Sequence, residues 1–88
     1  MVARIGGEEF VLLLPDTDAR AAQLLAQELL ENIGRTHIPS VGYITVSAGV
    51  SSLRNEDDAD DLHDMLKRSD DALYAAKRAG RNCVHRND

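Results

Sequence analysis

The pattern of apolar and polar residues along the chain changes from a strand-like to a helix-like period and back. It begins with two short strand-like runs, at residues 3–5 and 9–14, which Gly6 and Gly7 separate. Two adjacent glycines can both take a positive φ, so this spacing predicts a tight β-hairpin. The second run contains FVLLL, which is apolar at every position. It predicts a strand in the middle of a sheet, with helices covering both faces.

The next segment has the period of an amphipathic helix. Pro15 ends the second strand, and the polar residues 16–18 offer N-caps for a helix predicted over residues 18–32. Gly34 is well placed for its C-cap. Apolar residues recur at helical spacing and form one stripe, made up of Ala22, Leu25, Ala26, Leu29 and Ile33.

A third strand, a second helix and a fourth strand follow. Apolar and small polar residues alternate over residues 45–51, which predicts a strand. The acidic run at residues 56–61 is interpreted as a loop that leads into a helix over residues 61–79, because carboxylates suit a helix N-terminus. Gly80 ends this helix, and residues 82–85 form a short last strand. The apolar face of the helix contains Leu62, Met65, Leu66, Ser69, Leu73 and Ala76.

The predicted element order is therefore β-β-α-β-α-β. This order is typical of an α+β fold with a mostly antiparallel sheet. A chain of 88 residues allows one small domain, near the lower limit for burying a useful core. Two helices cannot cover a fully apolar strand and its neighbours on both faces, so we expect part of the apolar surface to stay uncovered.

Composition and charge exclude several classes of protein. No apolar run is long enough to span a membrane. The formal net charge of -5 argues against a general nucleic-acid-binding surface, which needs clustered Lys and Arg. Cys83 is the only cysteine, so no disulfide framework or thiolate metal site is expected, which favours the reducing cytoplasm. The three histidines, His37, His63 and His85, have no metal-ligand spacing.

The first place with candidate chemistry is the glycine turn. Glu8 and Glu9 follow Gly6 and Gly7 directly. Adjacent strand residues point to opposite faces, so both carboxylates can reach one ligand only where the turn bends the backbone. The glycines allow this bend and let a bulky ligand approach the main chain. Carboxylates there suit a hard cation such as Mg²⁺. The alternative is a plain hairpin with exposed acidic residues.

The second place is the end of the last helix, in ALYAAKRAGRN. Lys77 and Arg81 bracket the helix C-terminus and Gly80. Cations at this end stabilise the helix dipole, which is a purely structural explanation. The functional alternative is that both side chains bind an anionic group, Lys77 as a point charge and Arg81 as a planar fork.

Together these motifs resemble the GGDEF domains, the bacterial diguanylate cyclases. RIGGEEF at residues 4–10 is similar to the family signature in its GGEEF form. The resemblance continues through LLLPDT, TVSAGVSS and RSDDALYAAKRAGRN, in matching order and spacing, from residue 3 to residue 84. It implies a palm-like, ferredoxin-type sheet related to those of nucleotide cyclases and polymerases.

The resemblance also implies an activity. The family reaction joins two GTP molecules into cyclic di-GMP and releases two pyrophosphates, in bacterial second-messenger signalling. Each domain of an antiparallel pair holds one GTP. The 3′-hydroxyl of one nucleotide attacks the α-phosphorus of the other, and Mg²⁺ or Mn²⁺ neutralises the developing charge.

The family's functional residues carry over to matching positions of this chain. Glu8 takes the metal-binding position and is also a candidate to help deprotonate the attacking hydroxyl. Glu9 is the second acid of the signature, and Arg4 is a candidate to stabilise transition-state charge. Phe10 is expected to anchor the core. The positions that contact the nucleotide and its phosphates are Gly6, Gly7, Lys77 and Arg81.

The chain also departs from the family pattern. The first strand of a family domain, with the other metal-binding aspartate, and the guanine-reading residues after it have no counterpart here. We therefore expect residues 1–88 to be the C-terminal portion of one GGDEF domain, inactive alone, with a sensory or regulatory domain upstream in the full protein. The alternative is a degenerate, non-catalytic GGDEF module that binds a nucleotide or a protein.

The missing strand has a consequence for assembly. It is central in the family's sheet, so its absence should leave one edge of FVLLL or of its partner strand bare. Unpaired apolar edges recruit other chains. We therefore expect a homodimer or a higher oligomer, with a contact that includes residues such as Val11, Leu13 and Ile44.

Overall fold

The computed structural model describes residues 2–5, 9–53 and 62–87 of the chain. The elements follow the predicted order, β-β-α-β-α-β, and each predicted element overlaps the observed one. The third strand begins three residues later than predicted, at residue 48 instead of 45, and the first helix ends three residues later, at 35 instead of 32. The elements are β1 (Val2–Ile5), β2 (Phe10–Leu13), α1 (Ala19–Arg35), β3 (Ala48–Ser51), α2 (Leu62–Arg78) and β4 (Val84–Arg86).

The four strands form one mixed sheet in the order β2-β1-β3-β4. β1 is antiparallel to both of its neighbours, β2 and β3. β3 and β4 are parallel, and α2 is the crossover that connects them. The prediction of an α+β fold with a mostly antiparallel sheet is therefore confirmed.

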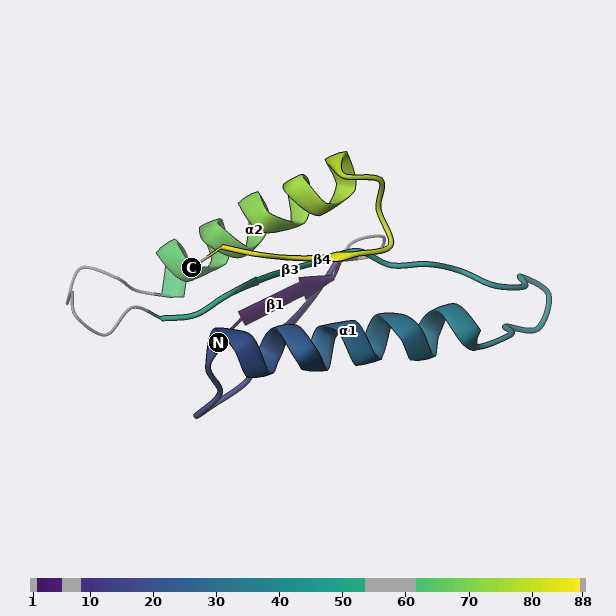
Figure 1. Ribbon diagram of the computed structural model, residues 1–88, viewed down its shortest axis with the longest axis horizontal. Coiled ribbons are helices and arrows are strands. Elements are labelled where there is room, and N and C mark those ends of the chain that lie inside the picture. Colours follow the sequence, from purple (N-terminus) through teal and green to yellow (C-terminus); the bar gives the residue numbers. More distant parts are fainter. Residues whose placement is uncertain (1, 6–8, 54–61, 88) are drawn as a thin grey trace.

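The two helices lie on opposite sides of the sheet (Figure 1). On the α1 side, Ala48 and Val50 of β3 pack in a core cluster with three residues of α1 and with Ala3 of β1. On the α2 side, Gly49 and Ser51 lie against the helix. All four residues of β3 are buried. The small residues Gly49 and Ser51 therefore face α2, and solvent reaches neither face of the strand. The α1 residues of the core cluster are Ala22, Ala26 and Leu30.

The expected central position of the FVLLL strand is wrong for this chain. β2 lies at the edge of the sheet, because β1 pairs with β3 on its other side. All four residues of β2 are exposed. Phe10, expected to anchor the core, is 59% exposed, so that prediction is also wrong. A strand that is apolar on both faces needs covering elements on both faces, and the two helices cover β3 instead. The expectation of a bare apolar edge agrees with this arrangement.

The start of α1 was predicted correctly, but its end was not. Asp18, within the predicted capping segment, is the N-cap, and its side chain accepts a hydrogen bond from the Ala21 N–H at 2.8 Å. Gly34 does not end the helix. It lies inside the last turn, and Thr36 caps the helix with its N–H on the Ile33 carbonyl. The Thr36 hydroxyl adds a bond to the Asn32 carbonyl, which makes a glycine cap unnecessary.

The apolar stripe of α1 is rotated slightly from its predicted position. Ala22 and Ala26 are buried as predicted, but Leu25 is 39% exposed and Leu30 is buried in its place. Leu30, Ala22 and Ala26 belong to the core cluster that contains Ala48 and Val50, so the buried side of α1 is the side that faces β3. In α2 the predicted face is largely correct, because Met65, Ser69, Leu73 and Ala76 are all buried.

Candidate functional site

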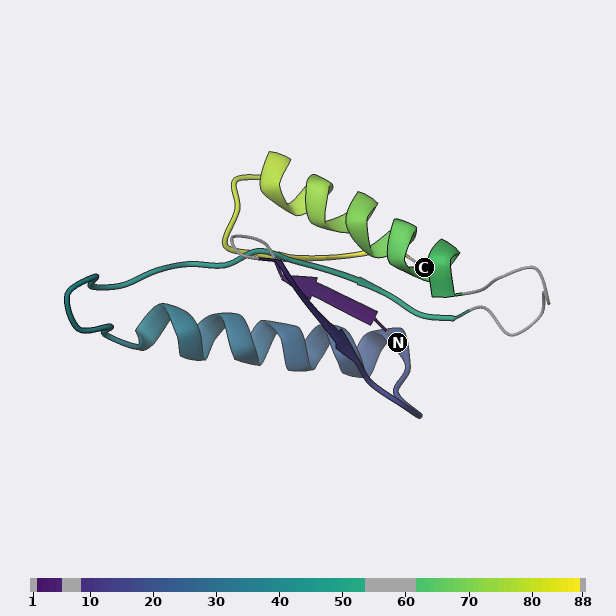
Figure 2. The same ribbon diagram turned by 180° about the vertical axis from the view of Figure 1, so that it is seen from behind.

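The register of the sheet brings the two sequence motifs to one end of the molecule. Ile5 pairs with Phe10 on one side and with Ala48 on the other, and Ala48 pairs with Val84. The connection from β1 to β2 is therefore at the same end of the sheet as the connection from α2 to β4. Figure 2 shows the chain returning from α2 to this end of the sheet. Residues that are far apart in the sequence are thus placed around one edge.

Three predicted site residues, Gly6, Gly7 and Glu8, lie outside the residues that the structure describes. The antiparallel pairing of β1 with β2 on either side of them agrees with the predicted hairpin. The roles assigned to these three residues, including metal binding by Glu8, stay predictions.

Arg4 connects the hairpin to α2. Its side chain extends from β1 on the α2 side, where one guanidinium nitrogen donates to the Glu9 carboxylate at 2.7 Å and the other to the carboxylate of Asp70. The side chain is only 24% exposed. The Arg4 Nε is buried, and no described residue accepts from it. Two of the predicted site residues, Arg4 and Glu9, are thus in direct contact.

Asp70 is the site residue that sequence reasoning missed. It lies within the RSDD segment, which contributed to the resemblance without being given a role. The signal that points to it is helical spacing. Asp70 precedes Lys77 by seven residues, about two helical turns, which places both on one side of α2.

A pocket of 360 Å³ lies beside this ion-pair network. Lys77, predicted to bind phosphate, and Glu9, the predicted acid, both line this pocket, although they come from different elements. Its lining contains both signs of charge. The lining residues are Glu9, Asp70, Asp71, Leu73, Tyr74 and Lys77. Arg81 is not among them.

Arg81 lies in the turn after α2 and is exposed. Gly80 has a φ of +119°, which a glycine takes at little cost, and the Arg81 N–H donates to the Ala76 carbonyl at 3.0 Å. This geometry confirms that Gly80 ends the helix. Arg81 itself has a φ of +65°, in the left-handed region. Lys77 therefore lies in the helix, whereas Arg81 lies in the turn that follows it.

The described residues do not form a metal site by themselves. No group of three or more His, Cys, Asp and Glu side chains among them could hold a metal ion. The Glu9 carboxylate already accepts from Arg4.

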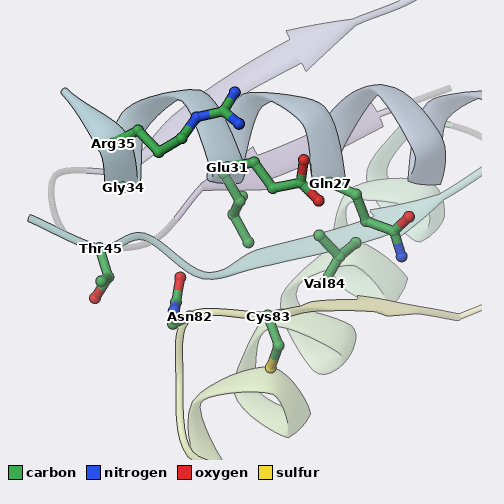
Figure 3. A pocket seen from close by; sticks show the side chains of 9 residues that line it. Gln27, Glu31, Gly34, Arg35, Thr45, Asn82, Cys83 and Val84 are labelled. Carbon is green, nitrogen blue, oxygen red and sulfur yellow. The ribbon is translucent and has the colours of Figure 1, made fainter.

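Two larger pockets lie elsewhere and contain none of the predicted catalytic or phosphate-binding residues. One, of 750 Å³, lies between α1 and residues 82–84 (Figure 3) and carries polar side chains including Gln27, Glu31 and Arg35. The other, of 710 Å³, is mostly apolar and is lined by Ile5, Phe10, Leu29, Ile33, Ile38 and Ile44 among others. Neither helix in the described part of the chain is long and apolar enough to cross a membrane.

Comparison with known proteins identifies the class to which this fold and site belong. Residues 1–83 match the family model described as "Diguanylate cyclase, GGDEF domain". The chain belongs to the GGDEF domain family.

Individual relatives agree with this assignment. The chain is 44% identical over 84 residues to the diguanylate cyclase DgcM of Escherichia coli K12, and 41% identical over 86 residues to a diguanylate cyclase of Vibrio cholerae. These matches cover 96% and 94% of this chain, but only 20% and 26% of the relatives. The chain therefore spans about a fifth to a quarter of the length of these two relatives.

Solved structures show the same fold. The active GGEEF domain of a Vibrio cholerae diguanylate cyclase superimposes with a TM-score of 0.82 at 38% identity, over 94% of this chain and 53% of that one. The GGDEF domain of DgcB from Caulobacter crescentus, in complex with c-di-GMP, gives 0.79 at 31% identity, over 94% and 49%. These solved structures therefore confirm the palm-like cyclase fold that the resemblance implied.

Proposed function

We propose that this chain is the C-terminal portion of a diguanylate cyclase domain, which converts two GTP molecules into cyclic di-GMP and two pyrophosphates. The observation that carries the proposal is the meeting of Glu9, from the signature hairpin, with Lys77, from α2, in one pocket. The family assignment over residues 1–83 supports it. A site for a nucleoside triphosphate needs a cation that binds phosphate, as Lys77 would on the helix, and an acid near the reacting groups, as Glu9 would beside the hairpin.

The chain's own residues have separate tasks in this proposal. Lys77 and Arg81 bind the terminal phosphates of GTP through charge-assisted hydrogen bonds. Gly6 and Gly7 let the hairpin lie against the nucleotide. Glu9 is the second acid of the signature. Arg4 is held by Glu9 and Asp70, so it aligns the hairpin with α2, and its positive charge beside the pocket stabilises developing negative charge.

Mg²⁺ or Mn²⁺ would be held by Glu8, together with phosphate oxygens of the nucleotide and a ligand from outside residues 1–88. Hard divalent cations accept such oxygen ligands and neutralise the charge that develops during phosphoryl transfer. Glu8 is also the candidate to take the proton from the attacking 3′-hydroxyl. The protein is expected in the cytoplasm, where GTP is available, with a regulatory domain elsewhere in the full protein.

We expect the 88-residue chain alone to make no cyclic di-GMP above background. A displacement that lacks one metal ligand loses charge neutralisation and positioning, each worth several kcal/mol. The test is incubation with labelled GTP and Mg²⁺, followed by chromatography of the products. Product formation that stops on Glu8→Ala would show that the chain is a complete catalyst, and the proposal of an inactive fragment would then be wrong.

Phosphate binding can be tested without turnover. We expect Lys77→Ala to weaken GTP binding about tenfold or more in titration calorimetry, because a hydrogen bond to a charged group contributes roughly 1.5–3 kcal/mol. Lys67→Ala is the matched control, since Lys67 is an exposed lysine of the same helix and the change in net charge is the same. Equal affinities of the two variants for GTP would contradict the assignment of Lys77.

A second candidate function is association through the bare edge of the sheet. No described strand pairs with the outer edge of β2, and its four residues, Phe10 to Leu13, carry no charge that would oppose pairing. Two copies of an uncharged strand can pair antiparallel about a two-fold axis, which gives a closed homodimer. Val11 and Leu13 lie on this edge, and the exposed Ile44 lines the neighbouring apolar pocket. As the sole function it would describe a non-catalytic module, the alternative to a cyclase, whereas association as such is compatible with catalysis.

A further inference from the structure

The turn that carries Arg81 has an unusual backbone. Gly80, Arg81 and Asn82 have φ values of +119°, +65° and +49°. Glycine takes such values freely, but a residue with a long side chain, such as Arg81, is uncommon in this region and stays there only when surrounding contacts hold it. The contacts around the turn therefore decide from which point of the backbone the Arg81 side chain extends.

Several hydrogen bonds hold this turn. The Arg81 N–H donates to the Ala76 carbonyl at 3.0 Å, which closes the end of α2. The Cys83 carbonyl accepts from the first N–H of β3 at 3.0 Å, which attaches the following segment to the sheet. Between these two backbone bonds, the Asn82 N–H donates to the side-chain Oγ of Ser47 at 3.0 Å. Two of the bonds around the turn depend on the identity of a side chain: this one, and the bond from the Cys83 thiol to the Ala76 carbonyl at 3.4 Å.

The position of Ser47 is suited to this contact. It directly precedes β3 and is only 4% exposed. It alternates with Gly49 and Ser51, which lie against α2. A small apolar residue at position 47 would fill the same space but would leave the Asn82 N–H without this acceptor in a partly buried place. Figure 3 shows the Asn82 side chain among those that line the pocket below α1, so the contact with Ser47 uses the backbone of this residue and not its side chain.

We propose that Ser47 is a positioning residue for phosphate binding. Its hydroxyl accepts from the Asn82 N–H and thereby holds the left-handed turn that presents Arg81 to the phosphates of the nucleotide. This proposal rests on the proposed function, in which Lys77 and Arg81 bind those phosphates. Lys77 lies in the regular part of α2, before the turn. Ser47 therefore acts through Arg81 and leaves the contribution of Lys77 unchanged.

The first measurement needs no ligand. Amide hydrogen exchange, read by NMR, should be about tenfold faster at Asn82 in Ser47→Ala than in the parent chain. Ser51→Ala is the matched control. It removes a buried serine hydroxyl from the same side of the same strand segment, but one that bonds Ser69 and the Met65 carbonyl, away from the turn. Exchange at Asn82 that is unchanged in Ser47→Ala would overturn the claim that the hydroxyl holds the turn.

The second measurement is a double-mutant cycle on affinity for GTP and for inorganic tripolyphosphate. Ser47→Ala should weaken both by about five- to tenfold in the parent chain, and by less than about twofold when Arg81→Ala is already present. In the Lys77→Ala background the full loss should remain. A loss of the same size in all three backgrounds would mean that Ser47 supports the fold in general, and would overturn the positioning role.

Failure of the proposed function would appear differently. The parent chain would then bind neither GTP nor tripolyphosphate, before any substitution is made. In that case the role of Ser47 in phosphate binding is wrong together with the proposed function, and the exchange measurement still decides whether the hydroxyl holds the turn. Binding by the parent chain with an unchanged affinity in Ser47→Ala would overturn the positioning proposal alone.

Discussion

Gly49 is the point of closest approach between β3 and α2, and we expect Gly49→Ala to destabilise the fold strongly. A Cβ built on Gly49 would overlap the carbonyl oxygen of Ser69 and the amide nitrogen of Leu73, and would lie 2.9 Å from the Leu73 Cα. All three are backbone atoms of α2. No side-chain rotation can relieve these contacts, so the helix itself has to move away from the sheet.

The expected loss follows from this displacement. Ordinary contacts lie at 3.4–4 Å, so α2 would have to withdraw by roughly 1 Å from a closely packed face. Overpacking of this kind costs about 1–3 kcal/mol. The same movement would stretch the buried bonds from the Ser51 hydroxyl to the Met65 carbonyl and to Ser69, both 2.6 Å, which contribute about 1 kcal/mol each. We expect a total loss of about 3–5 kcal/mol, a large part of the stability of so small a domain.

The assay is urea unfolding followed by far-UV circular dichroism. Gly34→Ala is the control, because it adds the same methyl group inside α1, where nothing lies within 4 Å of the new Cβ. That variant should gain about 0.5–1 kcal/mol, since alanine favours the helix over glycine. A loss below about 1 kcal/mol for Gly49→Ala, with an unchanged dependence on urea, would refute the close contact between α2 and β3.

Two further predictions concern the ends of the elements. Asp18→Ala should lower the free energy of unfolding by about 1 kcal/mol in urea, because the Ala21 N–H loses its capping acceptor; a change below about 0.3 kcal/mol would argue against this cap. If the chain associates through β2, Leu13→Lys should shift it to the monomer in sedimentation velocity, because a charged side chain opposes pairing at an edge strand. Leu24→Lys, at a leucine of similar exposure on α1, is its control, and an equal shift in both would contradict the edge-strand contact.

The order and type of the elements could be predicted from the sequence because each carries a local signal. The apolar period of both helices and the alternation over β3 are such signals, as is the glycine that ends α2. The place of β2 in the sheet could not be predicted in this way. FVLLL indicates that the strand prefers apolar neighbours on both of its faces. In the structure, however, the two helices cover β3, whose small residues let α2 approach closely. Phe10 was misplaced for the same reason.

The candidate site was predictable in part. Lys77 was singled out as a cation at a helix end, and the structure places it in a pocket with Glu9. The contact of Arg4 with Asp70 could not be predicted, because it joins residues 66 positions apart in the sequence and depends on how α2 lies across β1. Ser47 gave no signal of its own, since a serine in an alternating strand usually faces solvent. Its hydrogen bond with the Asn82 N–H joins distant parts of the sequence, so only the structure shows it.

The pairing of β1 sets the order in which the chain can fold. On one edge Ile5 pairs with Phe10, which is five residues away, and on the other with Ala48, which is 43 residues away (48 − 5). A local hairpin closes within about microseconds, whereas the second pairing has to close a long loop and is the slower event. α2, which carries Asp70 and Lys77, follows β3 in the chain and packs on it. We therefore expect the groups from the hairpin and from α2 to meet only in the last stage of folding. A ligand that needs both would bind no earlier state, and would stabilise the fully folded chain alone.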